Sequence, residues 1–279
     1  MLSKTRRPCE TDSLLGGSPS YRTRTSYLQT LAVHFKSDIN LNHTELILLF
    51  CYVITGLLDS SAVFIWGSFA SMQTGNTVYL GLGAIGADRN PSMRWKTAGI
   101  SIASFCVGSL CFSLFHQWAS PRRRWVLCCS FAVQLLCVVG AAVMVTVYRS
   151  EAYSASSQLR WQAMWPLALV AFQSSGQAVC SRVLNRNSMI SVVLTSAYCD
   201  LFSVAEFPNP LGGKLGAEDF RRLGSIVCLV VGVLIGGMCA KTSLGLVGAL
   251  WLVVFGKGLI VLAWLFWKGE DEIDMIDSE

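Results

Sequence analysis

The sequence predicts an all-α fold, a polytopic transmembrane bundle whose helices cross a membrane several times. The chain is 53% hydrophobic and only 14% charged, and its mean hydropathy of +0.50 is too high for a soluble globular domain. Its apolar residues are gathered in long runs, and tryptophans and basic residues stand near the ends of these runs. Apolar helices with interfacial anchors of this kind are typical of integral membrane proteins.

The lengths of the runs predict which of them are full spans. A helix needs about 20 apolar residues to cross a bilayer. The runs that reach or approach this length are 46–66, 98–118, 125–148, 163–181, 223–240 and 243–267. Two others, 77–87 and 189–205, are short or interrupted, and we interpret them as half-helices or re-entrant segments. This gives six full spans and two short or broken helices within residues 45–267, with eight crossings as the alternative.

The two halves of the bundle, 45–148 and 163–267, share one plan. Each begins with a long apolar run, passes through a polar interruption and a short helix, and ends with two long runs. When the halves are aligned, Thr74 falls opposite Thr195. We therefore expect an internal repeat of two halves. Broken helices at matching places of two halves are the sequence feature that best indicates the central site of a transporter.

The segments outside the bundle are polar. Residues 1–44 are rich in Ser, Thr and basic side chains and residues 268–279 are acidic, so we expect two disordered tails. Most Lys and Arg residues fall on the side of the two termini, which predicts that both termini are cytoplasmic. An acidic di-leucine-like segment at 10–15 would favour a vacuolar or endosomal membrane, but the sequence does not distinguish these from the plasma membrane.

The composition argues against several other classes of function. The basic residues lie in the tail and between the apolar runs, so the net charge of +5 does not indicate nucleic-acid binding. The 11 cysteines lie mostly inside apolar runs without paired metal spacing, and we expect packing residues, no metal and no cofactor. The chain has only three histidines and no H-E-x-x-H or G-x-S-x-G motif, so we do not expect an enzyme.

A polar signature runs through the first apolar stretch and beyond its end. It consists of Gly56-Leu57-Leu58-Asp59, then Gly67-Ser68-Phe69-Ala70-Ser71-Met72, then Thr74-Gly75-Asn76-Thr77-Val78. This series resembles the signature of the YoaK-like family of multi-pass membrane proteins, and the resemblance covers roughly residues 45–267. The second half departs from that family's pattern, because 171–175 keeps Gln173 but lacks the asparagine and Ser196 replaces a glycine. The family has no known function, so the resemblance implies membrane architecture and no activity.

Two charged residues lie deep within apolar runs. Asp59 is near the middle of the first run, and Lys257 lies in the last one between two glycines. An ionised side chain at this depth is costly unless it is paired. Asp59 is therefore expected to carry a proton or to hold a cation, with a structural role as a hydrogen-bond anchor as the alternative. Lys257 is the candidate partner of Asp59 or Asp200, or else the group that binds an anionic solute.

Thr74, Gly75 and Asn76 predict a break before a short helix that starts near Thr77. Glycine tolerates left-handed torsions, and Thr or Asn can cap the helix, whose positive end attracts anions. The candidate substrate- or ion-binding site combines these residues with the intramembrane charges and one amide of the second half. It consists of Asp59, Thr74, Gly75, Asn76, Gln173 and Lys257, with Asp200 and Thr195 as secondary candidates.

One face of the run 223–240 carries small residues at every fourth position, namely Gly224, Cys228, Gly232, Gly236 and Ala240. Such a smooth face lets another helix approach closely, either within the monomer or at the interface of a homo-oligomer.

The leading functional hypothesis is a small-solute permease or proton-linked transporter of unknown substrate, whose partners are the lipid bilayer and a small solute or a proton. In it, Asp59, the T-G-N tripeptide and Lys257 converge on a hydrated midplane pocket. The alternatives are a membrane scaffold or assembly factor without transport activity, and an intramembrane enzyme.

Overall fold

The computed structural model describes Phe35 and residues 37–40, 43–87, 94–120, 122–148, 161–184, 194–203, 217–242 and 245–267. Within these ranges the chain forms eight helices and no strand, apart from one isolated bridge between Asp38 and Arg123. The helices are α2 (Thr44–Trp66), α3 (Gln73–Ala84), α4 (Arg94–Trp118), α5 (Arg124–Val147), α7 (Trp161–Val183), α8 (Leu194–Ser203), α9 (Ala217–Lys241) and α10 (Gly245–Leu265). The predicted all-α class is confirmed. The predicted tails, apart from Phe35, 37–40 and 43–44, lie outside the described residues.

Five helices of the described chain are long and apolar enough to cross a membrane: α2, α4, α5, α9 and α10. Their number and composition indicate an integral membrane protein. Helix α7 has a similar length of 23 residues, but a row of buried polar side chains makes it less apolar. Helices α3 and α8 contain 12 and 10 residues. At 1.5 Å per residue they are roughly 18 and 15 Å long, much shorter than the 30 Å hydrocarbon core.

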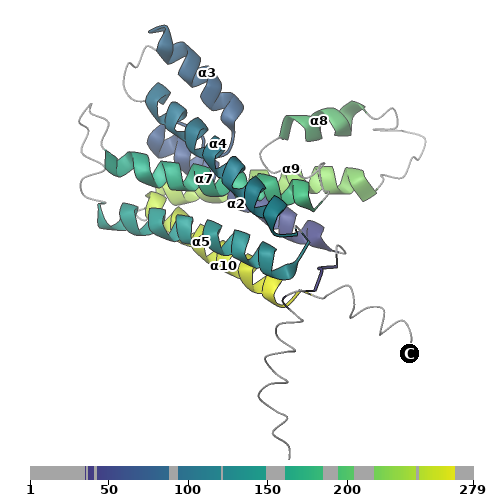
Figure 1. Cartoon of the computed structure of the whole chain (residues 1–279). Coiled ribbons are helices and arrows are strands. Elements are labelled where there is room, and N and C mark those ends of the chain that lie inside the picture. Colours follow the sequence, from purple (N-terminus) through teal and green to yellow (C-terminus); the bar gives the residue numbers. More distant parts are fainter. Residues whose placement is uncertain are drawn as a thin grey trace, which may run out of the picture.

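The long helices pack in pairs (Figure 1). Helix α2 makes its most extensive contacts with α9, and α4 makes its most extensive contacts with α7. Helix α5 packs against both α7 and α10. The short helices lie at the edge of this bundle, since α3 packs mainly against α4 and α8 against α9. A short N-terminal segment is joined to the bundle at the start of α5, where the backbone N–H of Ile39 donates to the carbonyl of Arg122 at 3.1 Å.

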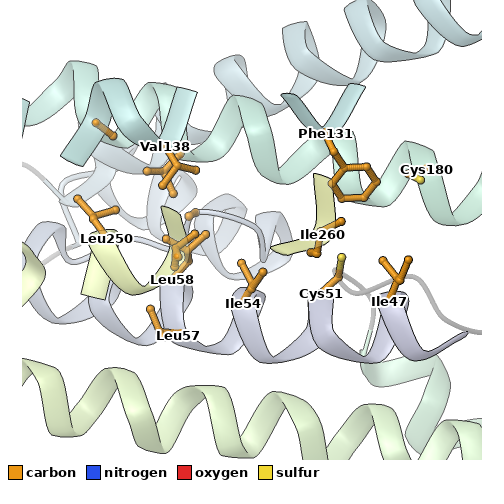
Figure 2. Packing of buried hydrophobic residues seen from close by; sticks show 14 of the residues in the cluster. Ile47, Cys51, Ile54, Leu57, Leu58, Phe131, Val138, Cys180, Leu250 and Ile260 are labelled. Atoms are coloured by element: carbon orange, nitrogen blue, oxygen red, sulfur yellow. The ribbon is translucent and has the colours of Figure 1, made fainter. Parts of the chain in front are cut away.

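The main apolar core lies between α2, α5, α7 and α10. Figure 2 shows Ile47, Cys51, Ile54 and Leu58 in a row along α2, with Phe131 and Val138 of α5 and Leu250 and Ile260 of α10 around them. All of these side chains are buried. Because α2 supplies one whole side of the core, its position controls the shape of the bundle interior.

Small residues determine how closely α2 and α9 approach each other. A Cβ added to Gly232 would overlap the backbone carbonyl of Val53, and one added to Gly236 would overlap Ser60 and the carbonyl of Leu57. In return, Gly56 of α2 faces the carbonyl of Leu229. Of the two roles expected for the small-residue face of α9, the structure shows packing within the monomer, because α2 already covers it.

Candidate functional site

Asp59 binds the chain segment that follows α2. This helix ends at Gly67, whose left-handed φ of 69° and N–H bond to the carbonyl of Val63 reverse the chain direction. The reversal brings two backbone N–H groups to the carboxylate: Ala70 and Ser71 both donate to Asp59 Oδ1 at 2.8 Å. The Ser71 hydroxyl donates to Oδ2. Asp59 is only 2% exposed, so the buried carboxylate is an anchor for this turn.

Asn76 clamps the same turn from the other side. Its Oδ1 accepts the N–H of Phe69 at 2.9 Å, and its Nδ2 donates to the carbonyl of Phe69 at 2.8 Å. The Ser101 hydroxyl of α4 donates to that carbonyl at 2.7 Å, and Gln73 Nε2 donates to the carbonyl of Ala70 at 3.0 Å. Asn76 is fully buried. We call Asp59, Ser71, Gln73, Asn76 and Ser101 the turn network.

The predicted break at Thr74-Gly75-Asn76 is in the wrong place. These residues form the first turn of α3, which begins at Gln73, and the non-helical segment is 67–72. Gly75 has no left-handed torsion; it is needed because the ring of Phe69 lies 2.7 Å from where its Cβ would be. Thr74 is exposed. The physical reason for the shift is that Asn76 caps the backbone of Phe69, seven residues earlier, and not the end of its own helix.

Lys257 forms a second, separate site in the bundle interior. Its side chain is fully buried, and its Nζ donates a hydrogen bond to Gln134 Oε1 of α5 and lies 5.2 Å from the centroid of the Phe131 ring. Cys51, Cys137 and Cys180 are close enough to Lys257 to interact electrostatically with it. No carboxylate of the described residues lies within ion-pair distance of it. The expected pairing of Lys257 with Asp59 is not formed, because the turn network holds the carboxylate.

Two further buried amides belong to α7. Gln177 Nε2 of α7 donates to the carbonyl of Cys51 at 3.2 Å, and Gln173, one helical turn earlier, donates to the carbonyl of Val170 at 3.1 Å. Three atoms have no hydrogen-bond partner among the described residues, namely Gln134 Nε2, Gln173 Oε1 and Gln177 Oε1. Unpaired buried polar atoms are rare and call for an explanation. Gln177 reaches the neighbourhood of Lys257 through Cys51, which interacts with both residues, and we call Lys257, Gln134 and Gln177 the core amide cluster.

Among the described residues, Gln173 donates only to Val170 and Ser174 of its own helix, so the structure shows no contact between it and Lys257. Asp59, Gly75 and Asn76 lie together in another region, around the turn before α3. The partner of Lys257, Gln134, is a residue that the sequence interpretation missed. Its signal was available, because Gln134 is the one amide side chain in the run 125–148.

The secondary candidates do not join either site. Asp200 is half exposed, and its Oδ2 lies 3.8 Å from Arg222 Nε of α9. Thr195 is exposed. Since α8 packs against α9 at the edge of the bundle, Asp200 is a member of a peripheral ion-pair group and not the partner of Lys257.

With this geometry in hand, the chain can be compared with known families. A family described as a protein of unknown function, DUF1275, matches residues 47–263, which is most of the chain. The chain belongs to the DUF1275 family. No curated protein and no solved structure matches the chain. DUF1275 membership supports an uncharacterised domain family, while the narrower YoaK-like resemblance stays a prediction.

Proposed function

We propose that this DUF1275 protein is a transporter for a small solute, anionic or proton-linked, and that Lys257 is the central group of its site. The observation that carries the proposal is the fully buried ammonium whose hydrogen-bond acceptor is a neutral amide. A buried charge without a counter-charge is expensive, and an ionisable residue inside a membrane bundle is by default a functional candidate. Gln134 Nε2, which has no partner among the described residues, supplies a further donor beside it for a polar ligand.

The proposal includes six full spans, and the ends of the helices support this number. Glu45 and Arg221 pair at 2.6 Å, which places the first residues of α2 and α9 together. Arg124, at the start of α5, donates to the carbonyl of Trp267, just after α10. At the other end, Gly67 after α2 lies against Arg94 of α4. These contacts support an arrangement in which the long helices alternate in direction and the short helices α3 and α8 add no crossing.

The proposal also includes an inverted repeat of the two halves. When the helices of the two halves are matched in chain order, α2 corresponds to α7, α3 to α8, α4 to α9 and α5 to α10. Under this match the pair α2–α9 corresponds to the pair α7–α4, and these are the two most extensive contacts of the bundle. In both pairs a glycine of one helix lies against a backbone carbonyl of the other: Gly232 faces the carbonyl of Val53, and Gly108 faces the carbonyl of Phe172. Three spans in each half would give the halves opposite orientations, as in many transporters.

The first test is ion flux in proteoliposomes. The full chain is reconstituted, and uptake of chloride, phosphate and lactate is measured against empty liposomes. We expect uptake of at least one of these anions, and a loss of more than tenfold in Lys257→Met. Lys241→Met is the matched control, because this lysine is exposed at the end of α9 and should not affect uptake. Unchanged uptake in Lys257→Met would refute the central role of this residue.

A scaffold without transport activity is the second candidate. It is favoured by the turn network, in which Asp59 and Asn76 are fully occupied by partners of their own chain. This function gains support if none of the tested solutes is taken up by the folded, reconstituted protein. We also propose that both termini are cytoplasmic, and an intramembrane enzyme is the third alternative.

A further inference from the structure

An apolar pocket of about 210 Å³ opens between α4, α5 and α7. Its walls are Cys111 and Phe115 of α4, Cys129 and Val133 of α5, and Phe172 of α7. Val133 is 44% exposed, so the pocket opens on the outer surface of the bundle, which faces the lipid in the proposed arrangement. Its lining suits a hydrocarbon group and offers little to a polar one.

The inner wall of this pocket is the ring of Phe112, which is only 4% exposed. Behind the ring lies the side-chain amide of Gln134, a member of the core amide cluster. Both meet at Gly176 of α7: a Cβ there would lie 2.9 Å from Phe112 Cε2 and 2.7 Å from Gln134 Nε2. Gln134 in turn holds Lys257. The Phe112 ring therefore lies between the apolar pocket and the amide that binds the buried cation, and the missing Cβ of Gly176 lets the ring and this amide approach each other.

We propose that the pocket and the core amide cluster form one binding site for an anionic amphiphile, a molecule with a carboxylate or phosphate on a hydrocarbon chain. The chain fills the pocket, and the anionic group passes Phe112 to reach Lys257 and Gln134 Nε2. Three observations select this occupant. The lining is apolar, the cation has no carboxylate partner among the described residues, and Gln134 Nε2 is a buried donor without an acceptor there.

This inference rests on the proposed role of Lys257 and names the ligand class for it. The anionic group could belong to a free fatty acid or to a membrane lipid. The test therefore uses nanodiscs of neutral phosphatidylcholine, in which radiolabelled decanoate is the only added anionic amphiphile. A second arm replaces a quarter of the lipid by phosphatidylserine.

Equilibrium binding of decanoate to the full chain is measured after subtraction of binding to empty nanodiscs, with decanol as the uncharged probe of equal length. We expect decanoate to bind at least tenfold more tightly than decanol. Lys257→Met should reduce decanoate to the level of decanol. If phosphatidylserine competes with decanoate, the site binds a lipid headgroup. If it does not compete, the site binds a free fatty acid. Both outcomes agree with the proposal.

A pair of matched variants tests the pocket itself. Val133→Trp fills it, whereas Val143→Trp makes the same change at an equally exposed position of α5 that does not line the pocket. We expect Val133→Trp to weaken decanoate binding at least tenfold and Val143→Trp to leave it unchanged. Equal binding by both variants, or equal binding of decanoate and decanol, would overturn the inference.

The two proposals fail separately. If Lys257 is required for chloride, phosphate or lactate uptake but decanoate shows no specific binding, the transporter proposal stands and the amphiphile site falls. If decanoate binds in a Lys257-dependent way while no flux is found, the site stands and the transporter proposal falls.

Discussion

Replacing Asp59 with alanine removes the anchor of the turn between α2 and α3. Two backbone N–H groups, those of Ala70 and Ser71, lose their shared acceptor Oδ1, and the Ser71 hydroxyl loses Oδ2. An unsatisfied buried donor costs about 1–3 kcal/mol. The two N–H groups alone therefore predict that Asp59→Ala lowers the free energy of unfolding by about 2–6 kcal/mol.

Asp59→Asn provides the decisive comparison. The amide keeps an oxygen at the place of Oδ1 for both N–H groups, and the Ser71 hydroxyl can rotate to accept from the new NH₂ group. The amide oxygen accepts weaker hydrogen bonds than the carboxylate, but this loss of stability is partly offset because no charge has to be buried. We expect a loss of about 1 kcal/mol or less, with anion uptake retained.

The assay is a titration of the purified protein with sodium dodecyl sulfate in mixed micelles, followed by circular dichroism. Ser61→Ala is the control, because Ser61 is buried in the same helix and its hydroxyl has no hydrogen-bond partner among the described residues. It should not lower stability, because it removes a buried hydroxyl that has no partner there. If Asp59→Asn destabilises as strongly as Asp59→Ala, the anchoring role is refuted. If it leaves stability intact but abolishes uptake, the carboxylate has a proton-linked role after all.

Further variants test the remaining contacts by the same titration. Lys257→Met should leave the free energy of unfolding unchanged or raise it by about 1–4 kcal/mol, because it removes a buried charge. Gln134→Leu should lower it by about 3–5 kcal/mol, because the ammonium loses its acceptor. A large loss of stability in Lys257→Met would indicate an additional counter-charge. Gly232→Ala should cost about 1–3 kcal/mol through overlap with the neighbouring backbone. Gly237→Ala should raise the free energy of unfolding by up to about 1 kcal/mol, because the added Cβ meets open space. Equal effects of Gly232→Ala and Gly237→Ala would contradict the close packing of α2 and α9. Asn76→Leu should cost about 1–3 kcal/mol, since it leaves the N–H of Phe69 without its acceptor while the carbonyl of Phe69 keeps the Ser101 hydroxyl. A loss below about 1 kcal/mol would show that the clamp is dispensable.

The sequence predicted the helices well because the bilayer imposes a strict requirement on the length and polarity of each span. The predicted run 98–118 lies within α4, and 125–148 coincides with α5 to within one residue at each end. The short elements were also placed correctly between the long ones. Their shortness is visible because polar residues interrupt the apolar pattern on both sides.

The partners of the buried polar residues could not be predicted in the same way. Asp59 is satisfied by backbone groups 11 and 12 residues away, a contact that depends on a left-handed turn at Gly67. Such a turn leaves no periodic signal. The pairing of Lys257 with Gln134 joins residues 123 positions apart, and only the packing of α5 on α10 brings them together. The sequence shows which polar residues are buried in an apolar run, but the bundle decides which of them meet.

The close fit between α2 and α9 has a consequence for biogenesis. Val53 and Gly232 touch, yet 179 residues separate them in the chain. At a translation rate of about 5–20 residues per second, α2 is made roughly 10–35 s before its main neighbour. During that interval its glycine-containing side is open to other transmembrane segments or to a chaperone in the membrane. Chains that terminate before α9 would keep that side uncovered, which makes them natural substrates for membrane quality control.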